Sequence, residues 1–154
     1  ALSALPGLAD PTVSALPNHA LFTVDGQTAA PTAFLIDGSN YIKLRDIAAM
    51  LADTEKGFAV AYDLATDSVA LAGGRTYTPL GTELAGVRDA AVVQAGAGSQ
   101  QITLDGAPLT LTAYMIDDEN YVKLRDLAQA IDCGITYDPA TQAVDLNPSL
   151  PYEA

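Results

Sequence analysis

The residues of this chain that suggest chemistry lie in a phrase that occurs twice, as NYIKLRDIA at residues 40–48 and NYVKLRDLA at residues 120–128. Each phrase carries a tyrosine, a lysine and an arginine on alternate positions. An aromatic ring beside two cations is suited to holding a glycan or an acidic polymer. One hypothesis is therefore a duplicated ligand patch, whose binding residues would be Tyr41, Lys43, Tyr121 and Lys123.

The same phrase also has the pattern of a structural element, and we favour this scaffold interpretation. Apolar residues recur with helical spacing, so each phrase predicts an amphipathic helix of about three turns. An arginine in the first turn is disfavoured by the helix dipole and needs a specific partner. We expect two equivalent ion pairs, from Arg45 to Asp63 and from Arg125 to Asp138, because the arginine and the aspartate recur at matching positions in the two copies.

Other reactive residues are few. The chain has one histidine, His19, and one cysteine, Cys133, so a Ser-His-Asp or Cys-His arrangement is not expected and no internal disulfide can form. We interpret Cys133 as a small core residue rather than a reactive thiol. No metal-ligand, phosphate-binding or dinucleotide-binding motif is present. The sequence therefore predicts a protein that is not an enzyme and holds no cofactor, with a hydrolase using an unrecognised carboxylate pair as an alternative.

One acidic turn, residues 117–120 (Asp-Asp-Glu-Asn), has oxygen ligands of the kind that Ca²⁺ prefers. It lacks the spacing of an EF-hand loop, and the matching turn of the first phrase, DGSN, has much less charge. A solvated turn is the preferred interpretation.

Composition narrows the possible partners. The formal net charge is −12 and the sequence pI is about 4.1, so nucleic acids and anionic lipid surfaces are disfavoured. The apolar runs are too short to span a bilayer. Residue 1 is Ala, and residues 1–19 are rich in Ala, Leu, Pro and Ser. We interpret this stretch as a tail that remains after signal-peptide removal, which predicts a secreted or cell-surface protein.

The repetition extends well beyond the phrase. Residues 22–53 match residues 102–133 at a spacing of 80, and residues 60–71 match residues 135–146 after about five extra residues in the first copy. Each copy predicts two strands joined by an Asp-Gly turn, a helix and a closing hairpin. The expected fold is α+β, with two tandem β-β-α-β-β repeats, each a small antiparallel sheet covered by one helix.

The predicted boundaries are a tail at 1–19, a first repeat with its connecting segment at 20–96 and a second repeat at 97–154. The stretch QAGAGS at residues 94–99 predicts a flexible joint. Pseudo-two-fold packing of the repeats and separate beads on this joint both stay open.

The whole pattern resembles the copper amine oxidase N-terminal-like domain, or stalk domain. The resemblance covers residues 20–147 and depends on the two phrases, the Asp-Gly hairpins, the YD-x-A-T hairpins and the run YTPLGTEL of the first copy. It implies an exported protein of a Gram-positive bacterium, often with tandem stalk domains. The stalk is not the copper-binding part, so the resemblance transfers no catalytic or metal residue.

Together these observations predict a non-catalytic module of the cell envelope that acts in spacing, adhesion or protein association. The alternative is a glycan- or peptidoglycan-binding module that uses the Tyr/Lys/Arg patches. The expected partner is a cell-wall polymer or another envelope protein, with no nucleic acid and no membrane insertion.

Overall fold

The computed structural model describes residues 12–86, 92–97 and 100–153. Strands account for 46% of the described residues and two short helices for 10%, so the predicted α+β class is wrong and the described part of the protein is mostly β. Six strands close into a barrel, and two further sheets have four strands each.

The barrel combines strands from both copies. Its order around the ring is β1 (Thr12–Pro17), β4 (Ala33–Ile36), β5 (Ser39–Lys43), β12 (Glu119–Lys123), β11 (Ala113–Ile116) and β8 (Val93–Ala97). All pairings are antiparallel. Alternate positions on all six strands point inward, as expected for a closed sheet. The residues that fill the interior are Ala15, Phe34, Ile36, Tyr41, Ala95, Ile116 and Tyr121.

Each outer sheet joins a hairpin of one copy to a hairpin of the other. One sheet has the order β10 (Ala107–Pro108), β9 (Gln101–Leu104), β7 (Ser68–Gly73), β6 (Phe58–Asp63). The other has the order β13 (Gly134–Asp138), β14 (Ala143–Asn147), β2 (Phe22–Val24), β3 (Gln27–Ala29). The exchange occurs at parallel pairs, β7 with β9 and β14 with β2. The copies are therefore interleaved.

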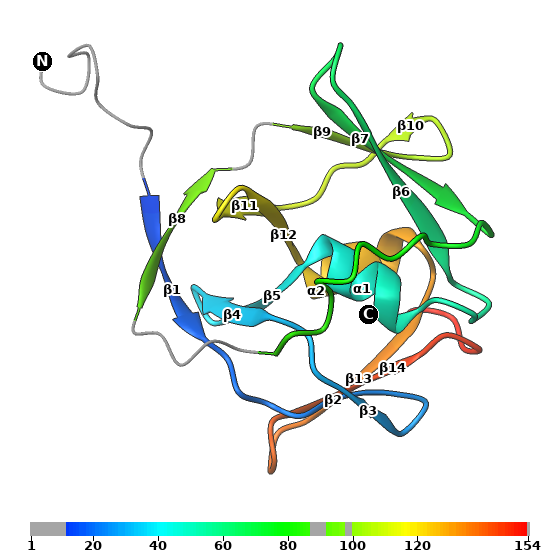
Figure 1. The fold of residues 1–154 in the computed structure, drawn as a ribbon. Coiled ribbons are helices and arrows are strands. Elements are labelled where there is room, and N and C mark those ends of the chain that lie inside the picture. The colour runs from blue at the N-terminus through cyan, green and yellow to red at the C-terminus, as the bar shows by residue number, and fades with distance from the viewer. Residues whose placement is uncertain (1–11, 87–91, 98–99, 154) are drawn as a thin grey trace, which may run out of the picture.

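The two helices are α1 (Leu44–Met50) and α2 (Leu124–Ala130), shorter than the three turns expected. Figure 1 shows them between the barrel and the two outer sheets. Their predicted apolar stripes are confirmed as core, because each helix buries the leucine that begins it and the residues three and four positions later. A second core forms there from the helices, the outer sheets and the outward faces of β5 and β12.

The predicted Asp-Gly hairpin turns are confirmed. Asp25 and Gly26 both have positive φ, 49° and 79°, as do Asp105 and Gly106, 52° and 86°. Two successive residues with positive φ are typical of a type I′ turn, whose twist matches that of the flanking strands.

The expected tandem arrangement is wrong for a physical reason. A two-stranded hairpin exposes unpaired edges and has too little apolar surface to be stable alone. The outer hairpins of each copy satisfy one edge by pairing with the other copy. The boundary near residue 96 therefore separates no independent units.

Two segments predicted to be linkers are barrel strands instead. Residues 12–17, expected within the tail, form β1, and most of QAGAGS lies in β8. Ser14 is the Cα partner of Gln94, and these residues lie 80 positions apart. The first copy therefore begins near residue 12 and the second near residue 92. Residues 1–11 of the tail and residues 98–99 of the joint lie outside the described residues.

Candidate functional site

The tyrosines of the repeated phrase are core residues. Tyr41 is 5% exposed and Tyr121 is 4% exposed. Tyr41 packs edge-to-face on Tyr114 at 5.2 Å between ring centroids, and Phe34 packs on Tyr121 at 5.4 Å. Burial raises the pKa of the Tyr41 hydroxyl above its ordinary value. The prediction that these rings contact a ligand is therefore wrong.

The two lysines of the phrase have different environments. Lys43 forms an ion pair with Glu119 at 3.0 Å, and its side chain is only 14% exposed. Lys123 stands at the matching position of β12. The residue that corresponds to Glu119 in the other copy is Ser39, which carries no charge. Within the described residues Lys123 has no acidic partner. Of the predicted binding residues, Lys123 is the one that lines a pocket.

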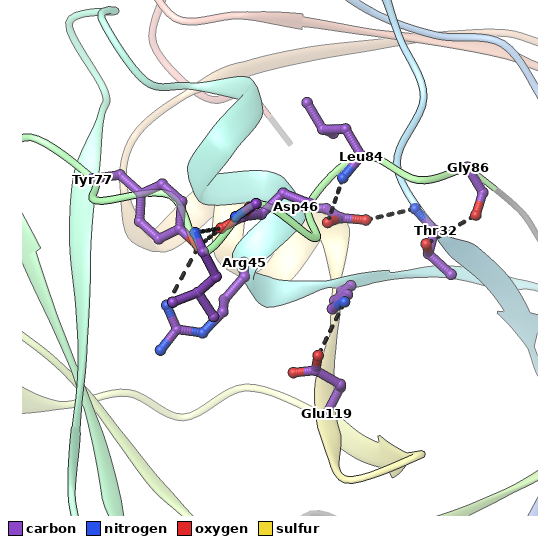
Figure 2. Close-up of polar contacts among 11 residues, drawn as sticks. Thr32, Arg45, Asp46, Tyr77, Leu84, Gly86 and Glu119 are labelled. Atoms are coloured by element: carbon purple, nitrogen blue, oxygen red, sulfur yellow. Dashed lines mark hydrogen bonds and ion pairs between the residues drawn. The ribbon is translucent and has the colours of Figure 1, made fainter.

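The predicted ion pairs from Arg45 to Asp63 and from Arg125 to Asp138 are not formed. Arg45 Nη1 instead donates to the Tyr77 hydroxyl at 3.3 Å (Figure 2). Each aspartate accepts from the backbone N–H two residues later, at 2.9 Å in both copies. This bond closes the aspartate's own hairpin turn, so its repetition has a local cause.

The acidic residue of the phrase has a role that the sequence analysis missed. Asp46 is fully buried, and it accepts from the Thr32 N–H at 2.7 Å and the Leu84 N–H at 3.0 Å (Figure 2). Asp126 accepts from the Thr112 N–H at 3.0 Å. The aspartate thus ties the helix to the residue just before β4 in the first copy and just before β11 in the second. The sequence did contain a signal for this role, because an aspartate occurs at the same helical position in both copies.

Two pockets of similar size, about 400 and 420 Å³, lie at matching positions of the two copies. Their lining residues correspond almost one to one in the repeat alignment. Each pocket is bounded by the helix start and closing hairpin of one copy and by a barrel turn of the other. Arg125, Tyr137 and Asn40 line the first pocket, where Arg45, Tyr62 and Asn120 line the second.

The charges of the two pockets differ. The first, which we call the cationic pocket, is lined by Lys123 and Arg125 and by no acidic residue. The second contains Arg45 but also Asp118 and Glu119. The difference arises in the turns, because the positions of Asp118 and Glu119 are Gly38 and Ser39 in the first copy. A comparison of these two turns in the aligned sequence would have shown that the cationic pocket lacks the acidic residues of the other one.

Polar and aromatic groups complete the cationic pocket. Asn18 donates to the Asn40 side chain and accepts from the Ala20 N–H at 3.0 Å, which holds both amides in place. Tyr137 is 47% exposed. Two cations, fixed amides and an accessible phenol ring can hold an anionic group on a polar, ring-containing molecule.

The acidic turn does not assemble a calcium site. Glu119 is engaged by Lys43, and Asn120 donates to Gln100 at 2.6 Å. In the described ranges, no three His, Cys, Asp or Glu side chains gather as metal ligands would. Cys133 is a buried core residue, as predicted, and burial raises the pKa of its thiol to about 11. None of the described helices has the length and apolar character needed to cross a membrane.

Comparisons of the chain with protein-family models, with curated proteins and with solved structures found no match.

Proposed function

We propose that this protein is a non-catalytic, exported module of a Gram-positive cell envelope that binds an anionic wall polymer in the cationic pocket. The observation that carries the proposal is the pair Lys123 and Arg125, which line one pocket without an acidic neighbour in a chain of net charge −12. On such a surface, a local concentration of positive charge attracts anions against the overall field.

The lining residues favour binding over hydrolysis. A glycosidase needs two carboxyl groups that face each other across the substrate. The cationic pocket has no carboxylate in its lining, and the carboxylates of the second pocket come from adjacent residues of one turn. The envelope setting derives from the resemblance of the repeated phrase to stalk domains.

The closed architecture also suits a module that works outside the cell as a spacer or adhesion unit. A barrel leaves no free strand edge, and the interleaved outer sheets join the two copies into one body. Such a body can present the pocket at a fixed position on the envelope.

The test is a pull-down of the purified chain on insoluble cell wall, before and after extraction of the anionic phosphate polymers. Lys123→Ala is the test variant, and Lys43→Ala is the matched control at the equivalent position. We expect saturable binding that is lost on extraction and in Lys123→Ala and kept in Lys43→Ala. Absence of saturable binding, or equal loss in both variants, contradicts the proposal.

A further inference from the structure

The second pocket, which the proposed function does not use, has both signs of charge in its lining. Arg45 comes from the first turn of α1, Asp118 from the turn between β11 and β12, and Glu119 from the start of β12. The volume of the pocket, about 420 Å³, is in the range of cavities that hold small molecules. A pocket with this lining suits a molecule that carries both charges itself.

Two of these charges are not neutralised by the protein. Glu119 forms its ion pair with Lys43 at 3.0 Å (Figure 2). Within the described residues, no ion pair joins Arg45 to a carboxylate, and Asp118 has neither an ion pair nor a hydrogen bond from another side chain. One cation and one anion therefore line the same cavity without contacting each other.

The cation of this pocket is held in place before any ligand binds. Arg45 Nη1 donates to the Tyr77 hydroxyl at 3.3 Å, and the guanidinium carbon lies 6.0 Å from the centroid of the Tyr77 ring (Figure 2). Tyr77 is buried, and its hydroxyl donates in turn to Glu83. Arg45 keeps its other N–H groups for a ligand. Such preorganisation lowers the entropy cost of binding.

Polar side chains fix the shape of one wall of the pocket. Asn120 donates to Gln100 at 2.6 Å, Gln100 donates to Asp67 at 3.0 Å, and the Tyr62 hydroxyl also donates to Asp67, at 2.6 Å. These bonds hold the half-exposed Tyr62 ring against the opening of the pocket. The rest of the lining is apolar and consists of Leu44, Val60, Val69 and Met115.

We propose that the second pocket binds a zwitterionic amino-acid compound with an apolar side chain. Its carboxylate pairs with Arg45, its ammonium group pairs with Asp118, and its side chain lies on the apolar part of the lining. A polyanion is disfavoured by Asp118 and a simple cation by Arg45. The proposal is independent of wall-polymer binding, since it uses neither Lys123 nor Arg125.

The probes are leucine and the dipeptide alanyl-leucine, titrated into the full chain and followed by the chemical shifts of the backbone amides. Each probe is also tested with its amine acetylated and with its carboxyl group converted to an amide, which removes one charge at a time. Asp118→Asn and Arg45→Gln remove the same charges from the pocket. Asparagine tolerates the positive φ of 62° at position 118. Arg125→Gln, at the equivalent position of the cationic pocket, is the matched control.

We expect saturable binding of an unblocked probe, weakened at least fivefold by either block and by either pocket variant, and changed less than twofold in Arg125→Gln. Asp118→Asn should not weaken the acetylated probe further, and Arg45→Gln should not weaken the amide further, because each change removes one partner of the same pair. The tighter of the two unblocked probes shows whether a free amino acid or a peptide is the preferred source of the zwitterion.

The inference is overturned if neither unblocked probe binds saturably at millimolar concentration. It is also overturned if the blocked probes bind as well as the unblocked ones, or if Arg125→Gln weakens binding as much as Arg45→Gln does. The blocked probes leave the protein unaltered, so a variant that fails to fold cannot produce the expected pattern.

Discussion

Ile42 and Val122, which occupy the same position in the two copies, are direct partners across the β5–β12 ladder. Ser14 and Gln94, also 80 positions apart, are partners across β1 and β8 on the other side of the barrel. A pair of equivalent residues can face each other in an antiparallel ladder only where a local two-fold axis passes between them. The barrel therefore has a pseudo-two-fold axis through both ladders, and the chain resembles a homodimer whose subunits have been joined.

This relationship predicts that one copy alone does not fold as a monomer. In a fragment of residues 12–92, the outer strands β2 and β7 lack their parallel partners and the barrel lacks half its strands. We expect the fragment either to be unfolded or to dimerise about the same axis, as measured by circular dichroism and sedimentation equilibrium. The full chain is the control, and a folded monomeric fragment would contradict the interleaved fold.

The sequence predicted the local elements because their causes are local. Asp25 and Gly26 predict a tight turn, and the spacing of Leu44, Ile47 and Ala48 predicts a buried helical stripe. The interleaving was not predictable in this way, since period-two patterns show which face of a strand is buried and not which strand pairs with it. Strand β8 was missed because its Gly and Ala residues have the composition of a linker.

The site was predicted only in part. Lys123 was identified, but its alternation with Tyr121 suggested one shared surface, whereas alternate residues of that strand lie inside the barrel and at its rim. The roles of Arg45 and Asp46 depend on Tyr77 and Leu84, which lie more than 30 positions further along the chain. Such distant contacts leave no periodic signal in a single sequence.

We expect Asp46→Ala to be much more destabilising than Asp126→Ala. Removing Asp46 leaves two N–H groups, of Thr32 and Leu84, without their acceptor in a buried site, which costs about 2–4 kcal/mol. Removing Asp126 affects one N–H at a more exposed site and costs about 1 kcal/mol. Urea unfolding of both variants gives the comparison. Equal losses would show that the hydrogen bond from the Leu84 N–H to Asp46 adds nothing to stability.

The cationic pocket can be neutralised from its own turn. Ser39→Glu places a carboxylate where Glu119 stands relative to Lys43, so we expect it to pair with Lys123 and to lower cell-wall binding at least tenfold. An ion pair near the surface changes the free energy of unfolding by about 1 kcal/mol or less, so the variant remains folded. The measurement is the wall-binding isotherm with a urea unfolding curve on the same sample.

The reciprocal variant tests the same argument by gain of binding. Glu119→Ser removes the partner of Lys43, and adding Asp118→Gly gives the second pocket the two turn residues of the first. We expect the doubly substituted chain to bind about twice as much wall polymer at saturation. An unchanged capacity would mean that the charge of the lining does not decide binding.

The segment of residues 77–86, which Glu83 folds and Leu84 ties to Asp46 of α1, should open in acid. Burial raises the pKa of Glu83, but the hydrogen bonds from Leu80, Gly81 and Tyr77 outweigh it and hold this pKa at about 2. Because the folded pKa lies below the unfolded value of about 4.3, the stabilisation that the ionised Glu83 carboxylate gives to the folded segment is complete above about pH 4.3. It is lost as the pH falls through about 2. We expect the Leu84 amide to lose its hydrogen-exchange protection, relative to the Ile42 amide, over this interval. Glu83→Gln, which lacks the charge at every pH, should show the weaker protection already at pH 6. If this variant protects Leu84 as well as the wild type does at that pH, the carboxylate does not hold residues 77–86 in place.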